Sequence, residues 1–257
     1  RAARAGGAVL LDWQPRITAR EKSPRDLVTE ADVASQKLIR EIVWQAFPDH
    51  EFLGEEELPG GSIPPGRAAG AAPSAFRWIV DPLDGTANYV HGLNSFAVSI
   101  ALEHAGRTIA GVVFDPVLGE CYTAAAGAGA FLNGKPVRTS GCTKLDQAMV
   151  AASFSSNVAR GSPEVTRFIE VLHSTQTVRR LGSCALNLCY VASGRLDAYW
   201  TTSVKSWDVA AGMLVVAEAK GTISNLEGGP FDVDRPEFVV AATADLHRQL
   251  VEVLARV

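Results

Sequence analysis

An apolar segment that runs straight into two closely spaced aspartates constrains this chain more than any other feature. The segment FRWIVDP, residues 76–82, reads as a buried strand, and its last two residues begin DPLDGT, residues 81–86. Pro82 restricts the backbone between the two carboxylates, and Gly85 lets the chain approach a ligand closely. Two carboxylates just past a strand end can turn toward one point. A helix that begins at Gly85 or Thr86 would add free N–H groups, which form a cradle for phosphate.

The two halves of the chain differ in their pattern of elements. Helical spacing of apolar residues predicts a helix over about 29–47, closed by Pro48. Apolar runs separated by Gly or Pro over 95–139 predict an antiparallel meander. After Gly141 strands and helices alternate. We therefore expect an α/β protein with an α+β first half (residues 1–141), which holds metal and phosphate, and an α/β second half (142–257), which completes the site.

Two segments carry more local expectations. The stretch 58–74, LPGGSIPPGRAAGAAPS, is typical of a loop. In the second half, Ser162 and Pro163 are typical of a helix start. Helical spacing then predicts one buried face for this helix, made of Val165, Phe168, Ile169 and Leu172.

Composition excludes several classes of protein. A net charge of −4 gives no overall basic field, so we expect neither a nucleic-acid partner nor an acidic membrane surface. No apolar run reaches the roughly 18 residues of a membrane span. The first residues, RAARAGGAVLLDW, are expected to form an amphipathic helix, because Asp12 ends their apolar stretch too early for a signal peptide. The four cysteines form no CxxC pair, which favours a reducing, cytoplasmic setting.

Acids from other segments could join those of DPLDGT. Glu55 and Glu56 follow a short predicted strand, and Asp208 follows Ser-Trp at a predicted helix start. Carboxylates without a His or Cys cluster indicate a hard cation, and magnesium is favoured because it shares its coordination shell with phosphate and water. The competing interpretation is that Asp81 and Asp84 only cap the following helix. Two acids in this setting, with an acidic run upstream, favour the metal.

At this point the chain resembles the inositol monophosphatase family, within the superfamily of fructose-1,6-bisphosphatases and bisphosphate nucleotidases. Four blocks agree in order and spacing: Lys22 with DLVTEAD (26–32), GEE (54–56), WIVDPLDGT (78–86) and WDVAAG (207–212). Each block alone is weak evidence, but together they span nearly the whole chain. The resemblance implies a layered αβαβα sandwich, a magnesium-dependent phosphoric monoester hydrolase acting on an inositol, sugar or polyol phosphate, and a homodimer.

The resemblance also implies roles for individual residues. The metal ligands would be Glu55, Asp81, the carbonyl of Leu83, Asp84 and Asp208. They would hold two to three Mg²⁺ ions, with Mn²⁺ as a substitute and Li⁺ as an inhibitor. Asp32 and Thr86 would steer and activate a water that attacks phosphorus directly, and Glu56 would assist the metal ligands. By themselves, Thr29 and Asp32 read equally well as a helix capping box.

Further positions would surround the substrate. The implied phosphate and substrate contacts are Leu83, Asp84, Gly85, Thr86, Gly182, Ser183, Cys184, Thr201, Lys205 and Asp208. In inositol-preferring relatives a glutamate stands where Thr201 falls, which weakens the case for myo-inositol phosphate. Lys205 could meet a second anionic group or be a solvated lysine, and Ser183 could be only a helix N-cap.

Three alternatives remain open. DPLDGT is similar to the nucleophile loop of haloacid-dehalogenase-like phosphatases, although that family spaces its two aspartates by one residue instead of two. A non-catalytic regulatory scaffold could keep the same fold. Among enzymes of this superfamily, the other candidate activities are fructose-1,6-bisphosphatase, bisphosphate nucleotidase and histidinol phosphatase.

Overall fold

The computed structural model describes residues 1–14, 19–23, 26–58, 61, 74–155 and 158–257. Most of the loop predicted over 58–74 lies outside the described residues. Within them, no helix combines the length and the apolar character needed to cross a membrane.

A seven-stranded sheet dominates the first half of the chain. Its order is β3 (Glu51–Gly54), β4 (Phe76–Asp84), β5 (Ala97–His104), β6 (Arg107–Asp115), β7 (Glu120–Ala125), β8 (Gly129–Leu132) and β9 (Lys135–Pro136). Strand β3 is parallel to β4, and every other neighbouring pair in this sheet is antiparallel. The meander predicted over 95–139 is confirmed, and the short β8 and β9 extend it.

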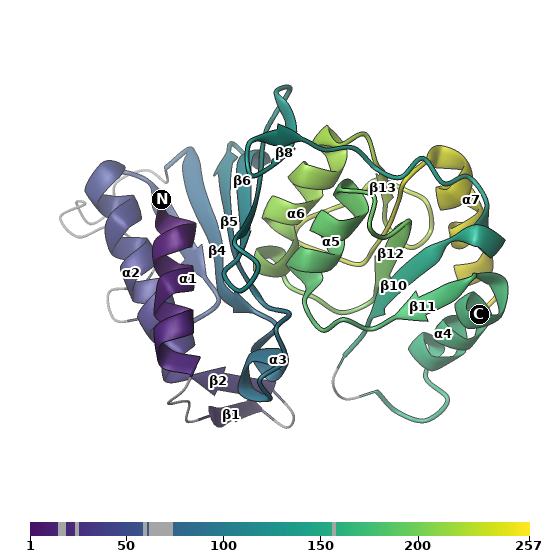
Figure 1. Ribbon diagram of the computed structural model, residues 1–257, viewed down its shortest axis with the longest axis horizontal. Coiled ribbons are helices and arrows are strands. Elements are labelled where there is room, and N and C mark those ends of the chain that lie inside the picture. The colour runs from purple at the N-terminus through teal and green to yellow at the C-terminus, as the bar shows by residue number, and fades with distance from the viewer. Residues whose placement is uncertain (15–18, 24–25, 59–60, 62–73, 156–157) are drawn as a thin grey trace.

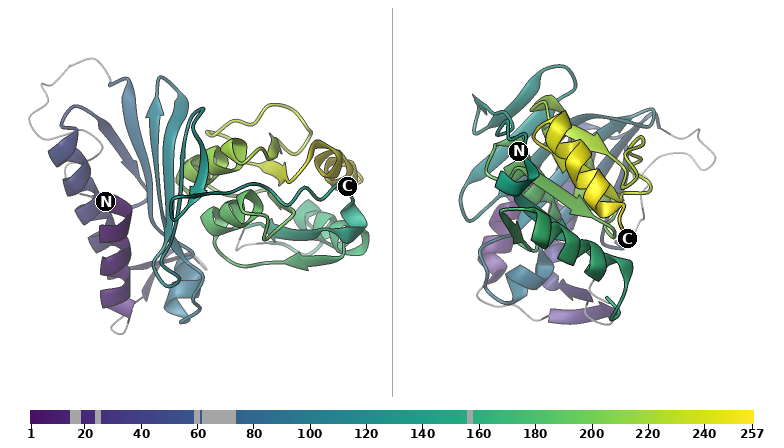
Figure 2. Two further views of the ribbon diagram at one scale, coloured as in Figure 1. Left: turned by 45° about the horizontal axis from the view of Figure 1, so that its top comes forward. Right: turned by 90° about the vertical axis from the view of Figure 1, so that its right-hand side faces the viewer.

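Two helices, α1 (Ala2–Trp13) and α2 (Glu30–Ala46), cover one face of this sheet (Figures 1 and 2). Both helices were predicted from the sequence. They approach closely at Gly6, where a Cβ would lie 2.7 Å from Ile39 Cδ1. A hairpin of β1 (Ala19–Ser23) and β2 (Asp26–Thr29), which was not predicted, leads into α2.

The second half forms a five-stranded sheet. Its order is β11 (Thr177–Arg179), β10 (Met149–Ser153), β12 (Ala198–Thr201), β14 (Phe238–Ala241) and β13 (Thr222–Ser224). Strand β10 is parallel to β11 and β12, whereas β14 is antiparallel to both of its neighbours. The alternation of strands and helices therefore produces a mixed sheet.

Four helices accompany the second sheet: α4 (Pro163–Ser174), α5 (Cys184–Ala192), α6 (Ser206–Glu218) and α7 (Ala244–Leu254). The predicted buried face of α4 was wrong in part. Ile169 and Leu172 are 44% and 48% exposed, and Val171 is the fully buried residue of this helix. Helix α4 packs beside α7 on the outside of the sheet, so its apolar stripe is only partly covered.

The helices and sheets stack in five layers. Helices α5 and α6 lie between the two sheets, and α4 and α7 cover the outer face of the second (Figure 2). With α1 and α2 on the opposite side, the predicted αβαβα arrangement is confirmed. Helices α5 and α6 cross at Gly212, where a Cβ would lie 2.7 Å from Leu188 Cδ1. Ser99 of β5 donates to the carbonyl of Trp207 at 3.2 Å, which attaches the start of α6 to the first sheet.

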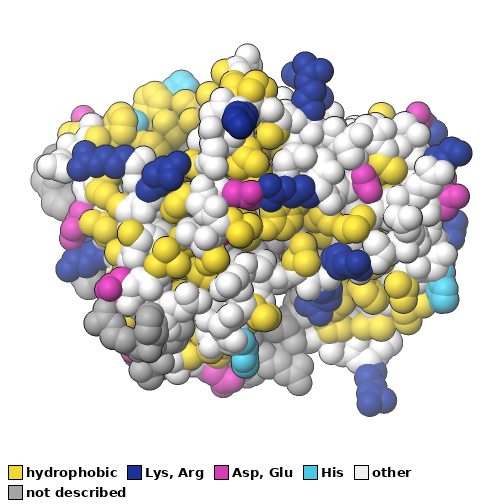
Figure 3. Space-filling model, in the orientation of Figure 1, with side chains coloured by type: hydrophobic (Ala, Val, Ile, Leu, Met, Phe, Trp, Pro, Cys, Tyr) yellow, Lys and Arg dark blue, Asp and Glu magenta, His cyan; other side chains and the backbone are white. Residues whose placement is uncertain are grey.

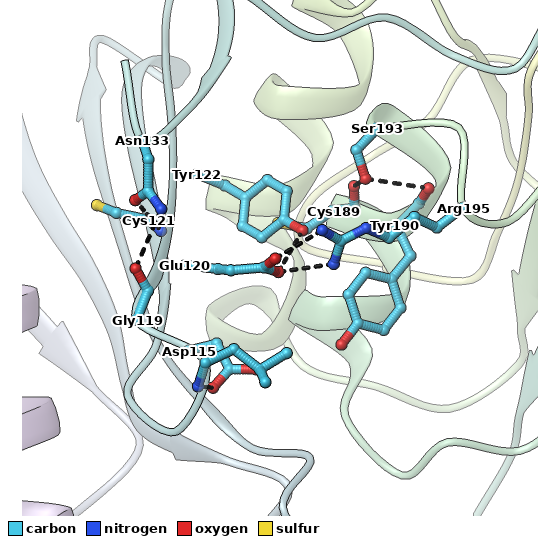
Figure 4. A network of polar contacts seen from close by, with 11 residues as sticks. Asp115, Gly119, Glu120, Cys121, Tyr122, Asn133, Cys189, Tyr190, Ser193 and Arg195 are labelled. Carbon is cyan, nitrogen blue, oxygen red and sulfur yellow. Dashed lines mark hydrogen bonds and ion pairs between the residues drawn. The ribbon is translucent and has the colours of Figure 1, made fainter. Parts of the chain in front are cut away.

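An ion pair also links the two halves (Figure 4). Glu120 of β7 accepts two hydrogen bonds from the guanidinium of Arg195, which follows α5, at 2.7 and 2.6 Å. The hydroxyl of Tyr122 donates to the same carboxylate at 2.9 Å. This bidentate geometry fixes the orientation of both charged groups. It therefore ties the edge region of the first sheet to the end of α5.

Candidate active site

Three aspartates from distant segments meet where β4 ends and α6 begins. Asp81 and Asp84 lie on β4 and Asp208 lies in the first turn of α6, and one carboxylate oxygen of each lies within 4.8 Å of the others. Asp81 and Asp84 are 2% and 6% exposed, and Asp208 is half-buried. The structure thus brings together three of the carboxylates that the sequence identified as candidate metal ligands.

Strand β4 reaches further than the sequence predicted. It continues to Asp84, and its pairing with β5 shifts register between Asp81 and Asp84. Residues three apart in a regular strand point to opposite faces, so this irregularity is what lets both carboxylates share one side. Pro82 suits the irregular segment because it has no N–H to donate. The N–H of Leu83 donates to Asp81 Oδ1 at 2.9 Å and fixes that carboxylate.

The beginning of α5 holds Asp84. The hydroxyl of Ser183 donates to Asp84 Oδ2, and the backbone N–H groups of Cys184 and Ala185 donate to the same carboxylate at 3.1 and 2.9 Å. Ser183 has no exposed surface, and its oxygen also accepts from the N–H of Leu186 at 3.2 Å. This side chain is therefore committed to Asp84 and to capping α5, and Ser183 does not line the cavity beside the aspartates, so its contact with substrate stays a prediction.

Two other predicted substrate contacts are not brought into the site. Thr201 is fully buried in β12, whose four residues are all buried, and it does not line the cavity beside the aspartates. Lys205 is exposed and does not line the cavity beside the aspartates. Its backbone N–H donates to Asp208 Oδ2 at 2.7 Å, so Lys205 orients that carboxylate through its main chain.

A cavity of about 230 Å³ opens beside the three aspartates. The predicted residues that line it are Glu55, Asp81, Leu83, Asp84, Gly85, Thr86, Gly182, Cys184 and Asp208. Gly85 precedes helix α3 (Thr86–Val90) with φ at 95°, and a Cβ there would lie 2.9 Å from the carbonyl oxygen of Ser95. This position therefore requires glycine. The cavity lining also includes four residues that were not predicted: Ser153, Phe154, Arg180 and Val204.

Asp32 and Thr86 approach each other beside this cavity. Thr86 Oγ1 lies 3.4 Å from Asp32 Oδ1 and 3.1 Å from the carbonyl oxygen of Leu83. Asp32 Oδ2 accepts from the N–H and the hydroxyl of Thr29 at 2.9 and 2.6 Å, so the same carboxylate also completes the capping box of α2. Burial raises the pKa of Asp32 to about 7, and the hydrogen bonds from Thr29 oppose that rise only in part.

Glu55 lines two neighbouring cavities, and Glu56 lines only one of these two. The N–H of Glu55 donates to the carbonyl of Val80 at 3.1 Å, and Glu55 lines the aspartate cavity. The side-chain amide of Gln36 holds the backbone of Glu56 by bonds of 2.6 and 2.9 Å. Glu56 lines an adjoining cavity of about 600 Å³, which Glu55 and Arg20 share. Glu56 is thus a neighbour of the aspartate cavity and does not line it.

Burial and mutual repulsion act together on the three aspartates. Burial is the main cause that raises the pKa of Asp84 to about 6 and that of Asp208 to about 8, and Asp84 adds repulsion at Asp208. Burial, followed by the charge of Glu55, raises the pKa of Asp81 well above its usual range. Among the described residues, no Lys, Arg or His forms an ion pair with these three groups. A set of converging oxygen ligands with uncompensated charge fits a hard divalent cation.

Both the sequence and the fold are similar to those of known proteins. A model of the inositol monophosphatase family matches residues 1–257. An inositol-1-monophosphatase of Mesorhizobium japonicum is 38% identical over 237 residues, which cover 91% of this chain and 85% of the relative. The Nus factor SuhB of Pseudomonas aeruginosa is 38% identical over 249 residues, 95% and 89% of the two chains. The crystal structure of the extragenic suppressor protein SuhB of Bartonella henselae is 35% identical with a TM-score of 0.89, covering 98% of this chain and 95% of that one.

Proposed function

The chain belongs to the inositol monophosphatase family and is a phosphoric monoester hydrolase, and from this premise we propose that it hydrolyses a small inositol, sugar or polyol phosphate with the help of magnesium. One observation carries the proposal. Asp81, Asp84 and Asp208 converge within 4.8 Å, without a paired cation among the described residues, beside a cavity of about 230 Å³.

We assign the metal ligands from the chemistry of the donors. Asp81, Asp84 and Asp208, with Glu55 and the carbonyl of Leu83, offer only oxygen atoms, which suits Mg²⁺, with Mn²⁺ as a substitute. The bound cation supplies Lewis-acid polarisation of the phosphoryl group and of the attacking water. We expect two to three cations and inhibition by Li⁺.

The remaining groups of the site would hold the phosphate and move a proton. Gly85 and Thr86 line the cavity, and their N–H groups would donate to phosphate oxygens. Asp32 and Thr86 would accept and steer the proton of the attacking water, and a pKa of about 7 lets Asp32 exchange that proton near neutral pH. A bond from the water oxygen to phosphorus forms as the bond between phosphorus and the ester oxygen breaks. The departing alkoxide takes a proton from solvent water and leaves as the alcohol, and Asp32 returns its proton to solvent.

The experiment that tests this function is phosphate release from a panel of phosphate monoesters, with magnesium, with a chelator, and with added lithium. We expect magnesium-dependent release that Asp81→Asn and Asp208→Asn reduce by at least about a hundredfold, with the fold retained. Glu227→Gln, which removes an exposed acid that does not line the cavity, serves as the matched control. Full activity of either aspartate variant would contradict the proposal.

Two further expectations concern the setting of the enzyme. We infer a reducing, cytoplasmic compartment, because Cys121, Cys142, Cys184 and Cys189 are all free. We also infer a homodimer, for which the highly exposed Leu93 and Leu118 offer apolar contact surface. Light scattering on the purified chain tests the dimer. On the face seen in Figure 3, Lys and Arg side chains are interspersed with neutral and apolar ones, which gives no support for a nucleic-acid partner.

A further inference from the structure

One positively charged side chain, that of Arg180, lies at the mouth of the aspartate cavity. Arg180 follows strand β11 and is the only Lys, Arg or His among the described residues that line this cavity. Its side chain is exposed, whereas Asp81 and Asp84 are buried. The cavity therefore has a buried acidic end and a basic group at its rim.

Aromatic rings hold the guanidinium of Arg180 in place. The Arg180 guanidinium carbon lies 4.1 Å from the ring centroid of Phe154, which also lines the cavity. Phe154 in turn packs edge-on against Phe168 at 5.9 Å and at a tilt against the fully buried Trp200 at 6.4 Å. A guanidinium over an aromatic face keeps its N–H edge available for hydrogen bonds. Arg180 is thus a preorganised donor at the rim.

The described residues use little of the hydrogen-bonding capacity of Arg180. A guanidinium has five N–H donors, and within the described part of the chain Arg180 makes one long bond of 3.5 Å, to the carbonyl of Phe154. No carboxylate of the described residues pairs with it, in contrast to Arg195, which pairs with Glu120, and to Arg77, which pairs with Glu103 at 2.8 Å. The positive charge is therefore available to an anion inside the cavity.

We propose that Arg180, stacked on Phe154, binds a second anionic group of the substrate, so that the preferred substrates are small phosphate monoesters that carry another phosphate or a carboxylate. This inference rests on the proposed function, which places the phosphate that is hydrolysed at the aspartates. The second group is favoured over that first phosphate because Arg180 is exposed at the rim, while the ligand atoms of the aspartates converge at the buried end. A guanidinium fork matches phosphate and carboxylate oxygens alike.

Matched pairs of substrates separate this role from a general effect on catalysis. The pairs are glucose 1,6-bisphosphate with glucose 1-phosphate, and 3-phosphoglycerate with glycerol 3-phosphate, each compared by kcat/KM. We expect the wild type to favour the doubly anionic member. Arg180→Gln should lower kcat/KM for that member by about tenfold to a hundredfold, as expected for a lost charge-assisted hydrogen bond, and for its partner by less than about threefold. Arg180→Lys should restore part of the preference.

Arg179 provides the control for charge alone. It is the neighbouring exposed arginine, donates to the carbonyl of Val178 at 3.0 Å and does not line the cavity. Arg179→Ala should leave the preference for the second anion intact. The two pairs also distinguish a phosphate from a carboxylate as the second group.

Several results would contradict the role of Arg180 in binding a second anion and would leave the proposed function unaffected. These are an equal loss of kcat/KM on both members of each pair, no change in Arg180→Gln, or the same effect in Arg179→Ala. If the wild type hydrolyses no ester at all, the proposed function fails separately. Calorimetric binding of glucose 1,6-bisphosphate and glucose 1-phosphate in the presence of Ca²⁺ then tests the subsite. Equal affinities of wild type and Arg180→Gln for the bisphosphate would contradict it.

Discussion

The hydroxyl of Ser183 donates a hydrogen bond to Asp84, 99 positions away in the chain. This contact ties the start of α5, between the two sheets, to the end of β4 in the first sheet. It also gives one buried carboxylate three donors, since the N–H groups of Cys184 and Ala185 bind it too. Asp84 is thereby oriented before any cation arrives, and the cost of bringing its charge close to Asp81 and Asp208 is partly offset.

Removing this donor should affect both the fold and the metal. In Ser183→Ala, α5 loses its cap and Asp84 loses a buried partner, so we expect a loss of about 1–2 kcal/mol in the free energy of unfolding and weaker magnesium binding. Denaturant unfolding and calorimetric titration measure the two effects. Ser193→Ala, at the other end of α5, removes a hydroxyl whose bonds within the described residues go to carbonyls of its own helix, and it should change neither quantity much. Unchanged magnesium affinity in Ser183→Ala would show that Asp84 does not need this donor.

Asp208→Asn should make the metal-free protein more stable. Burial and the charge of Asp84 raise the pKa of Asp208 in the folded protein to about 8. The contribution of Asp208 to stability is therefore fully present below its pKa in the unfolded chain, and it is lost as pH rises through the folded pKa. At pH 7.5 without metal, the variant should therefore unfold a few degrees above the wild type. With magnesium the order should reverse, because only the wild type keeps the full ligand set. A lower melting temperature of the variant in chelator would contradict the repulsion among these acids.

His247 should make the protein sensitive to acid. Its ring lies 2.7 Å from the hydroxyl of Ser224 and is 8% exposed, and burial lowers its pKa. A lowered folded pKa gives stability that is fully present above the unfolded value of about 6.5 and is lost as pH falls through the folded value. Replacing His247 by Gln should therefore reduce the loss of stability between pH 7.5 and 5. The exposed His173 is the control. If His173→Gln reduces the loss of stability between pH 7.5 and 5 by the same amount, the acid sensitivity does not come from His247.

The crossing of α5 and α6 should not tolerate a single added methyl group. A Cβ at Gly212 would lie 2.7 and 2.8 Å from Leu188 Cδ1 and Cβ, so Gly212→Ala must push the two helices apart or shift a buried leucine. We expect a loss of about 1–3 kcal/mol in stability despite the better helix propensity of alanine. Denaturant unfolding measures it. The double variant Gly212→Ala with Leu188→Val should recover part of the loss, and a neutral Gly212→Ala would show that the helices can separate at no cost.

The carboxylates of the site could be predicted from the sequence because they lie in short segments of distinctive spacing. The DPLDGT segment, with Asp208 at a predicted helix start, identified acids that the structure brings together. The capping box of Thr29 and Asp32 was also visible, because it is local. The boundary near residue 141 and the chemical roles of the individual residues remain predictions.

Features that depend on tertiary packing could not be read in the same way. Thr201 lies in a strand whose residues are all buried, and such a strand shows no polar and apolar alternation from which to tell its outward positions. Arg179 and Arg180 look equivalent in sequence, and only the fold places one of them at the cavity. The register shift that turns Asp81 and Asp84 to one side was likewise invisible, since it arises from pairing with β5.

Anomalous diffraction from crystals soaked in Mn²⁺ shows whether these acids gather a divalent cation. We expect manganese peaks bounded by the carboxylates of Asp81, Asp84 and Asp208, with Glu55 beside them, and loss of those peaks in Asp81→Asn. Peaks confined to exposed acids elsewhere, with the space between these three aspartates left without manganese, would contradict it.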